Sequence, residues 1–155
     1  MSLIEQYVSP FMQKHLSEHF AHLDEREFHV QLEEFLKFLY IVSIDGPGAF
    51  IPVNAEIDAI WHEYILQTRE YEQLCLLLPN KVFVHHQSAT LAGYTETADR
   101  ESVLKRMLQW LPRYYQHFGP FTEKTAQYWT MVQFLSQEFH FSLEEINKLA
   151  SSSTT

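Results

Sequence analysis

The feature that most constrains this chain is residues 54–86, where polar side chains sit on an apolar, helix-patterned background. Asn54 is a good helix N-cap. After it, apolar residues recur at intervals of three and four: Ile57, Ile60, Trp61, Ile65, Leu66, Leu74 and Leu77. Pro79 and Asn80 supply a stop and a turn. The pattern predicts a long helix ending at that turn, with Trp61 buried against the preceding helix.

Two polar residues of this helix lie on one face. Asp58 and His62 are four residues apart, which places them one helical turn from each other. The apolar residues Trp61 and Ile65 flank them, so we expect this edge to face protein rather than bulk water. Asp58 and His62 are therefore predicted to touch each other or to share a partner.

Two histidines follow a short β-prone run at residues 82–84. In an extended segment His85 and His86 point to opposite sides. If Phe83 points to the core, regular alternation turns His85 inward. We nevertheless expect His86 to approach Asp58, because the chain must leave the strand there and a turn resets the alternation.

Asp58, His62 and one of His85 or His86 form the main candidate site. A carboxylate with two imidazoles is a workable ligand set for Zn or Fe. The same residues suit a histidine that acts as a general base and is oriented by an aspartate. The third interpretation is structural, with an Asp–His pair tying the extended segment onto the helix.

Other polar motifs are weaker. His62-Glu63 begins the zinc-protease pattern His-Glu-x-x-His, but Leu66 stands where the second histidine is required, which excludes that class and leaves Glu63 as a solvated residue. Cys75 lies between two leucines and is predicted to be a buried small hydrophobe.

A histidine stripe also marks an earlier helix, with His15, His19 and His22 one turn apart. Three imidazoles in this arrangement could bind a transition metal. The stripe itself contains no carboxylate or cysteine, which favours a partly solvated helix flank.

In the rest of the chain, apolar residues recur almost throughout at the spacing of helices. Expected segments are one or two helices over residues 2–22, with Ser9 and Pro10 at the start of the second, and others near residues 24–43, 98–119, 122–139 and 142–150. Asp24 is the expected cap of the helix at 24–43, and Ser142 with Glu145 is the expected capping box of the last helix. Loops are expected at residues 44–49 and 87–97, and Pro112 should kink or break its helix. We predict an all-α, compact bundle of five to seven helices with one short extended segment near residues 82–86.

Composition bounds the class of protein. The 155 residues, 46% of them hydrophobic and only 4 of them Gly, predict a single helical domain over residues 1–150 and a frayed tail at 151–155. A formal charge of -9 disfavours nucleic acid and anionic membranes as partners. One Cys, no evident signal peptide and no membrane-length apolar run indicate a cytoplasmic protein.

A family resemblance rests on the ordered positions Asp58, Trp61, His62, Thr68 and Tyr71, followed by the run at residues 83–86. Two other segments join them: the helix before Pro52, and the later stretch Arg113-Tyr114-x-x-x-Phe118-Gly119 with Trp129 after it. Together these positions resemble the helical domain of the glycine-rich domain-containing protein-like family. The likeness covers roughly residues 25 to 130, and the glycine-rich part is absent. It implies the helical fold and marks these positions, including Thr68 and Tyr71, without implying an activity.

Two functional hypotheses follow. The first is a non-enzymatic helical binding module whose partner is a protein or a small molecule. The second is a metal-dependent or histidine-dependent enzyme, hydrolase-like, that uses Asp58, His62 and His86. A metal analysis of the purified protein, repeated on His62→Ala, separates the two.

Overall fold

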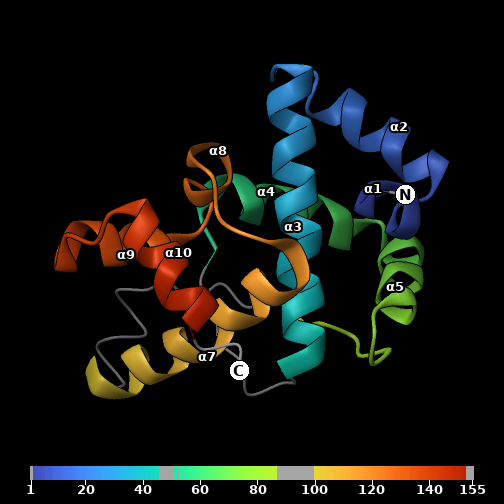
Figure 1. The fold of residues 1–155 in the computed structure, drawn as a ribbon. Helices are drawn as coiled ribbons and strands as arrows, with labels where there is room; N and C mark the ends of the chain where they lie inside the picture. Colours follow the sequence, from blue (N-terminus) through green and yellow to red (C-terminus); the bar gives the residue numbers. More distant parts are fainter. Residues whose placement is uncertain (1, 46–50, 52, 87–99, 153–155) are drawn as a thin grey trace. The chain divides into compact units, whose positions relative to one another are not determined.

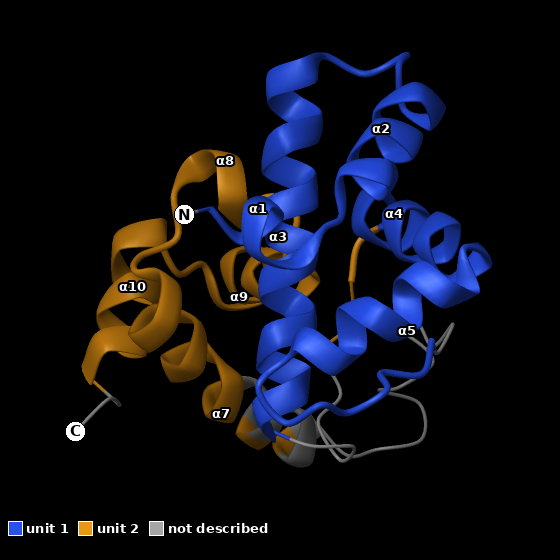
Figure 2. Cartoon of the chain, turned by 90° about the vertical axis from the view of Figure 1, so that its right-hand side faces the viewer, with its two compact units in different colours: residues 1–47, 55–86 blue, residues 48–54, 87–155 orange. Residues whose placement is uncertain are grey.

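The computed structural model of the protein describes residues 2–45, 51, 53–86 and 100–152 (Figure 1). These residues contain no strand and form nine helices, which confirms the all-α prediction; the number of helices is larger than the five to seven predicted. Two compact units divide the chain: unit 1 is Met1–Pro47 with Ala55–His86, and unit 2 is Gly48–Asn54 with Gln87–Thr155 (Figure 2). The prediction of one domain over residues 1–150 stays a prediction. No helix in the described part is long and apolar enough to cross a membrane.

Unit 1 begins with two short helices, α1 (Leu3–Tyr7) and α2 (Pro10–His19). Ser9 caps α2 by accepting a hydrogen bond from the backbone N–H of Met12, and Pro10 occupies the first turn, as the sequence predicted. The helix ends at His19, earlier than the expected residue 22. Met12 and Leu16 are fully buried, so one stripe of α2 anchors it to the core.

The long helix of unit 1 is α3 (Glu25–Asp45). Asp24 caps it, since its Oδ1 accepts from the backbone N–H groups of Arg26 and Glu27 at 2.9 and 3.1 Å. Its buried face is apolar apart from a few polar residues. Among these, Glu34 is 1% exposed and pairs with Lys37 through a 2.6 Å contact.

The predicted central helix is two helices, α4 (Ala55–Leu66) and α5 (Thr68–Leu77). Gln67 leaves the helical region with φ -90° and ψ 73°, so the expectation of one long helix is wrong. No proline or glycine marks the break. Its consequence is that α5 packs back against α4 and brings the Tyr71 ring to 6.0 Å from that of Tyr64.

A tight turn after α5 sends the chain back across α3. Lys81 adopts a left-handed backbone with φ 52°. Asn80 binds α3 twice, through its backbone N–H to Ser43 Oγ at 3.2 Å and through its side-chain amide to the Ser43 carbonyl at 2.7 Å. These bonds fix where residues 82–86 begin.

Unit 2 is built on α7 (Arg100–Phe118), which continues through Pro112 without the break that the sequence allowed. Gly119 ends the helix at φ 85°, as expected for a glycine C-terminus. Four buried rings form the core of this unit. The ring of Trp110 stacks on that of Trp129 with centroids 4.9 Å apart, and Tyr114 stacks on Phe121 at 3.9 Å.

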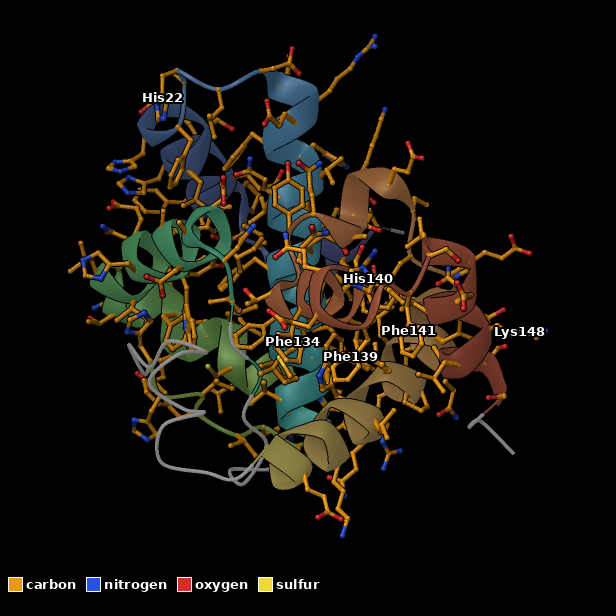
Figure 3. All side chains as sticks on the ribbon, turned by 90° about the vertical axis from the view of Figure 1, so that its left-hand side faces the viewer. His22, Phe134, Phe139, His140, Phe141 and Lys148 are labelled. Atoms are coloured by element: carbon orange, nitrogen blue, oxygen red, sulfur yellow. The ribbon has the colours of Figure 1, made fainter. Side chains whose placement is uncertain are left out.

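Three shorter helices complete unit 2: α8 (Glu123–Ala126), α9 (Thr130–Phe139) and α10 (Leu143–Ser152). Ser142 and Glu145 form the predicted capping box of α10. At the preceding corner, the ring of Phe139 lies beside those of Phe134 and Phe141, with centroids 5.8 and 6.2 Å away (Figure 3). An isolated bridge joins Val53 to Trp129.

Several expected segments lie outside the described residues. They are most of the loop at residues 44–49, the loop at 87–97, and the last three residues of the tail predicted at 151–155.

Asn147 generates a test of this packing. Its side chain donates to the Phe121 carbonyl at 2.9 Å and accepts from the Phe121 N–H at 2.7 Å, tying α10 to the segment after α7. We expect Asn147→Ala to lower the free energy of unfolding by about 1–3 kcal/mol, because both backbone groups lose their partner. Urea unfolding followed by tryptophan fluorescence measures the loss. The neighbouring, exposed Lys148→Ala is the control and should change stability by less than about 0.5 kcal/mol; equal losses would contradict the prediction.

Candidate functional site

The centre of the candidate site is a hydrogen-bonded pair on unit 1. The Nε2 atom of His86 lies 2.8 Å from Oδ1 of Asp58 on α4. An ionised carboxylate can only accept, so His86 Nε2 donates. The side chain of Asp58 is 45% exposed and that of His86 is 19% exposed. We call these two residues the Asp58–His86 pair; it is held in place yet open to solvent.

The side chains of residues 83–86 alternate between outside and inside, and this alternation decides which of the two histidines reaches Asp58. Val84 is buried and His86 is largely buried, whereas Phe83 is 46% exposed and His85 is exposed. The His85 ring lies against that of Phe83, with centroids 4.8 Å apart. The prediction that His86 rather than His85 approaches Asp58 is confirmed. Its reason is corrected, because Phe83 points outward and no reset of the alternation is needed.

A buried tyrosine anchors this segment to the helices. The Tyr71 hydroxyl accepts a hydrogen bond from Trp61 Nε1 at 3.0 Å and donates to the Val84 carbonyl. The pKa of the Tyr71 phenol lies far above its usual range, mainly because the side chain is buried. The phenol, which is protonated at neutral pH in any case, therefore keeps its proton for the Val84 bond in alkaline solution as well.

Cys75 belongs to the same buried region. It is 2% exposed, which confirms the prediction of a buried small hydrophobe. Burial raises the pKa of its thiol, so the reactive thiolate is disfavoured.

The buried ring of Trp61 packs against the Asp58–His86 pair. It is 5% exposed, and its ring contacts that of Phe38 on α3 edge to face at 5.0 Å, as expected for a tryptophan buried against that helix. Its other neighbour is the ring of His86, at 4.6 Å and also edge to face. His86 is thus fixed by a hydrogen bond on one edge and by an aromatic contact, which limits its rotation.

Two other residues predicted for the site, His62 and Thr68, are exposed and are not hydrogen-bonded to the Asp58–His86 pair. His62 is exposed, and its ring centroid is 6.1 Å from that of His86, so Asp58 and His62 share His86 as a neighbour. Thr68 is exposed at the start of α5. Within residues 2–45, 53–86 and 100–152, no group of three His, Cys, Asp or Glu is arranged to hold a metal ion. A Zn or Fe site at Asp58, His62 and His85 or His86 therefore stays a prediction.

Sequence reasoning missed a second polar cluster. Glu63 is not solvated as predicted: its side chain is 13% exposed and meets two histidines of α2, with Oε1 at 2.9 Å from His15 Nε2 and Oε2 at 3.5 Å from His19 Nε2. The spacing of His15 and His19 was visible in the sequence. Their carboxylate lies about 50 residues later, which no local pattern reveals.

Comparison with known proteins gives a family. The sequence model of the UCP032817-like family matches residues 1–144, so the chain belongs to that family. No curated protein and no solved structure matches the chain.

This finding corrects the resemblance to the glycine-rich domain-containing protein-like family, which is wrong. The positions behind it have a physical explanation within this fold. Trp61 and Tyr71 are core residues joined by a hydrogen bond, and Asp58 supports His86.

Tyr71→Phe tests the anchor. The substitution keeps the ring and removes the hydroxyl, leaving Trp61 Nε1 without its acceptor and the Val84 carbonyl without its donor. We expect a loss of about 1–3 kcal/mol in the free energy of unfolding, and faster amide hydrogen exchange in residues 82–86. Tyr115→Phe, at a half-buried position of unit 2, is the control. Unchanged exchange at residues 82–86 would show that Tyr71 does not hold the segment.

Proposed function

We propose that this member of the UCP032817-like family is a binding module, and that the surface around the Asp58–His86 pair recognises a basic protein partner. The observation that carries the proposal is the preorganisation of the pair. Tyr71, Trp61 and residues 82–86 fix His86 against Asp58, while nearly half of the Asp58 side chain remains exposed. A carboxylate held in one orientation at a surface binds a cation without paying further ordering entropy.

The distribution of charge favours a cationic partner. Unit 1 contains 13 acidic and 5 basic residues, a formal charge of -8, whereas unit 2 contains 7 acidic and 6 basic residues, a formal charge of -1. Nearly all of the excess negative charge of the chain therefore belongs to the unit that carries the pair. Such a field attracts basic partners and speeds their association.

Exposed apolar side chains accompany the pair. Leu66 is 59% exposed and follows His62 by one turn of α4, on the helix face that begins with Asp58. Phe83 is 46% exposed, on the segment that ends in His86. A partner that offers Lys or Arg beside an apolar side chain satisfies both kinds of contact.

A peptide titration tests the proposal. The probe is a fluorescent peptide of alternating lysine and leucine, with a glutamate–leucine peptide and a lysine–serine peptide as comparisons, measured by fluorescence anisotropy. We expect the lysine–leucine peptide to bind most tightly. Asp58→Asn should weaken its binding roughly twofold to fivefold, the range for losing a partly exposed charge contact.

Glu56→Gln is the matched control, because it removes one exposed carboxylate two residues earlier on α4, on another face of the helix. It should change the affinity much less than Asp58→Asn. If the two variants weaken binding equally, the affinity depends on the net charge of the protein alone, and the proposed surface is wrong.

Catalysis by His86 is the second candidate, favoured by one observation. An imidazole that donates to a carboxylate at 2.8 Å is the arrangement that orients a general base. A chromogenic ester hydrolysis assay tests it. Enzyme activity lost in both His86→Gln and Asp58→Asn, but kept in His85→Gln, would support a hydrolase; a rate indistinguishable among the three would exclude this role.

A further inference from the structure

A second exposed feature of unit 1 is a ladder of rings along α2. Phe11, His15 and His19 follow one another at four-residue spacing. The rings of Phe11 and His15 are 6.4 Å apart and nearly parallel at 10°, and those of His15 and His19 are 6.4 Å apart at 23°. Phe11 is 64% exposed, and the two histidine side chains are 31% and 50% exposed. We call these three residues the α2 ladder.

Glu63 of α4 holds the two imidazoles of the ladder. One carboxylate oxygen lies against His15 and the other against His19, at 2.9 and 3.5 Å. Glu63 sets the orientation of the His15 and His19 rings through their Nε2 atoms. The planes of successive rings in the ladder are nearly parallel. The carboxylate is mostly covered, so it acts by positioning the rings and by adding negative potential behind them.

The other charged groups near the ladder are mixed. Lys14 and Glu18 are exposed on α2 itself, and His22 follows the end of this helix. Glu70 of α5 accepts a hydrogen bond from the Ser9 hydroxyl at 2.8 Å, at the N-terminus of α2. Together with Glu63, the groups named here are three carboxylates and one lysine, in keeping with the charge of -8 on unit 1.

We propose that the α2 ladder is a binding surface for arginine side chains of a basic protein segment. A guanidinium is planar and weakly hydrated, so it stacks on flat rings more favourably than a lysine ammonium does. The rings lie about one helical turn apart and are partly exposed, so a segment that carries several arginines meets more than one of them, and the carboxylates attract its charge. This surface is separate from the Asp58–His86 pair and does not rest on the function proposed for that pair.

Discrimination between arginine and lysine tests the proposal. The probes are a fluorescent arginine–serine repeat peptide and the matching lysine–serine peptide, titrated into the full chain at 0.15 M salt. We expect the arginine peptide to bind at least about threefold more tightly, since stacking adds to a shared electrostatic attraction. Equal affinities of the two peptides would overturn the proposal.

Variants locate the contact. Phe11→Ala combined with His19→Ala should remove the preference for arginine and leave the weaker lysine-type binding. His29→Ala is the matched control, because His29 is exposed on α3 with its own Glu33 at 3.9 Å. Asp58→Asn should preserve the preference for arginine, which separates this surface from the Asp58–His86 pair. An arginine preference that survives in the double variant, with its fold verified by circular dichroism, would also overturn the proposal.

Discussion

The hydrogen bonds of the Tyr71 hydroxyl are the constraint on which the candidate site depends. One hydroxyl joins an indole N–H of α4 to a backbone carbonyl of residues 82–86, inside a region where an unpaired polar group is costly. With Val84 fixed inward, alternation turns His86 to the same side and into reach of Asp58. The orientation of the exposed pair thus follows from a buried contact two residues away.

Unit 1 carries seven of the nine histidines of the chain. Among its described residues, His15, His19, His29 and His86 lie within 4 Å of a carboxylate. The carboxylate partners of His86, His15 and His19 come from α4, on residues 58 and 63, five positions apart. One helix therefore orients two sets of imidazoles. Unit 2, by comparison, is organised around stacked aromatic rings and backbone-binding amides.

The sequence predicted what local patterns can encode. Helical periodicity gave the all-α class, and the caps at Ser9, Asp24 and Ser142 gave helix starts. The break at Gln67 was not predictable, because neither glycine nor proline marks it and the contact of α5 with α4 appears only in the folded chain. At the site, His86 was chosen for the wrong reason, since the exposure of Phe83 is set by Tyr71 rather than by local hydrophobicity. The contact of Glu63 with α2 depends on tertiary structure alone.

The most direct test of the central claim is the state of the His86 ring in solution, read by long-range ¹H–¹⁵N NMR of the histidine side chains. The neutral ring should carry its proton on Nε2, and its signals should shift in both Asp58→Asn and Tyr71→Phe, with His85 unaffected. A His86 ring that exchanges freely between tautomers, with the same shifts in wild type and in both variants, would contradict a pair held in place by the Tyr71 anchor.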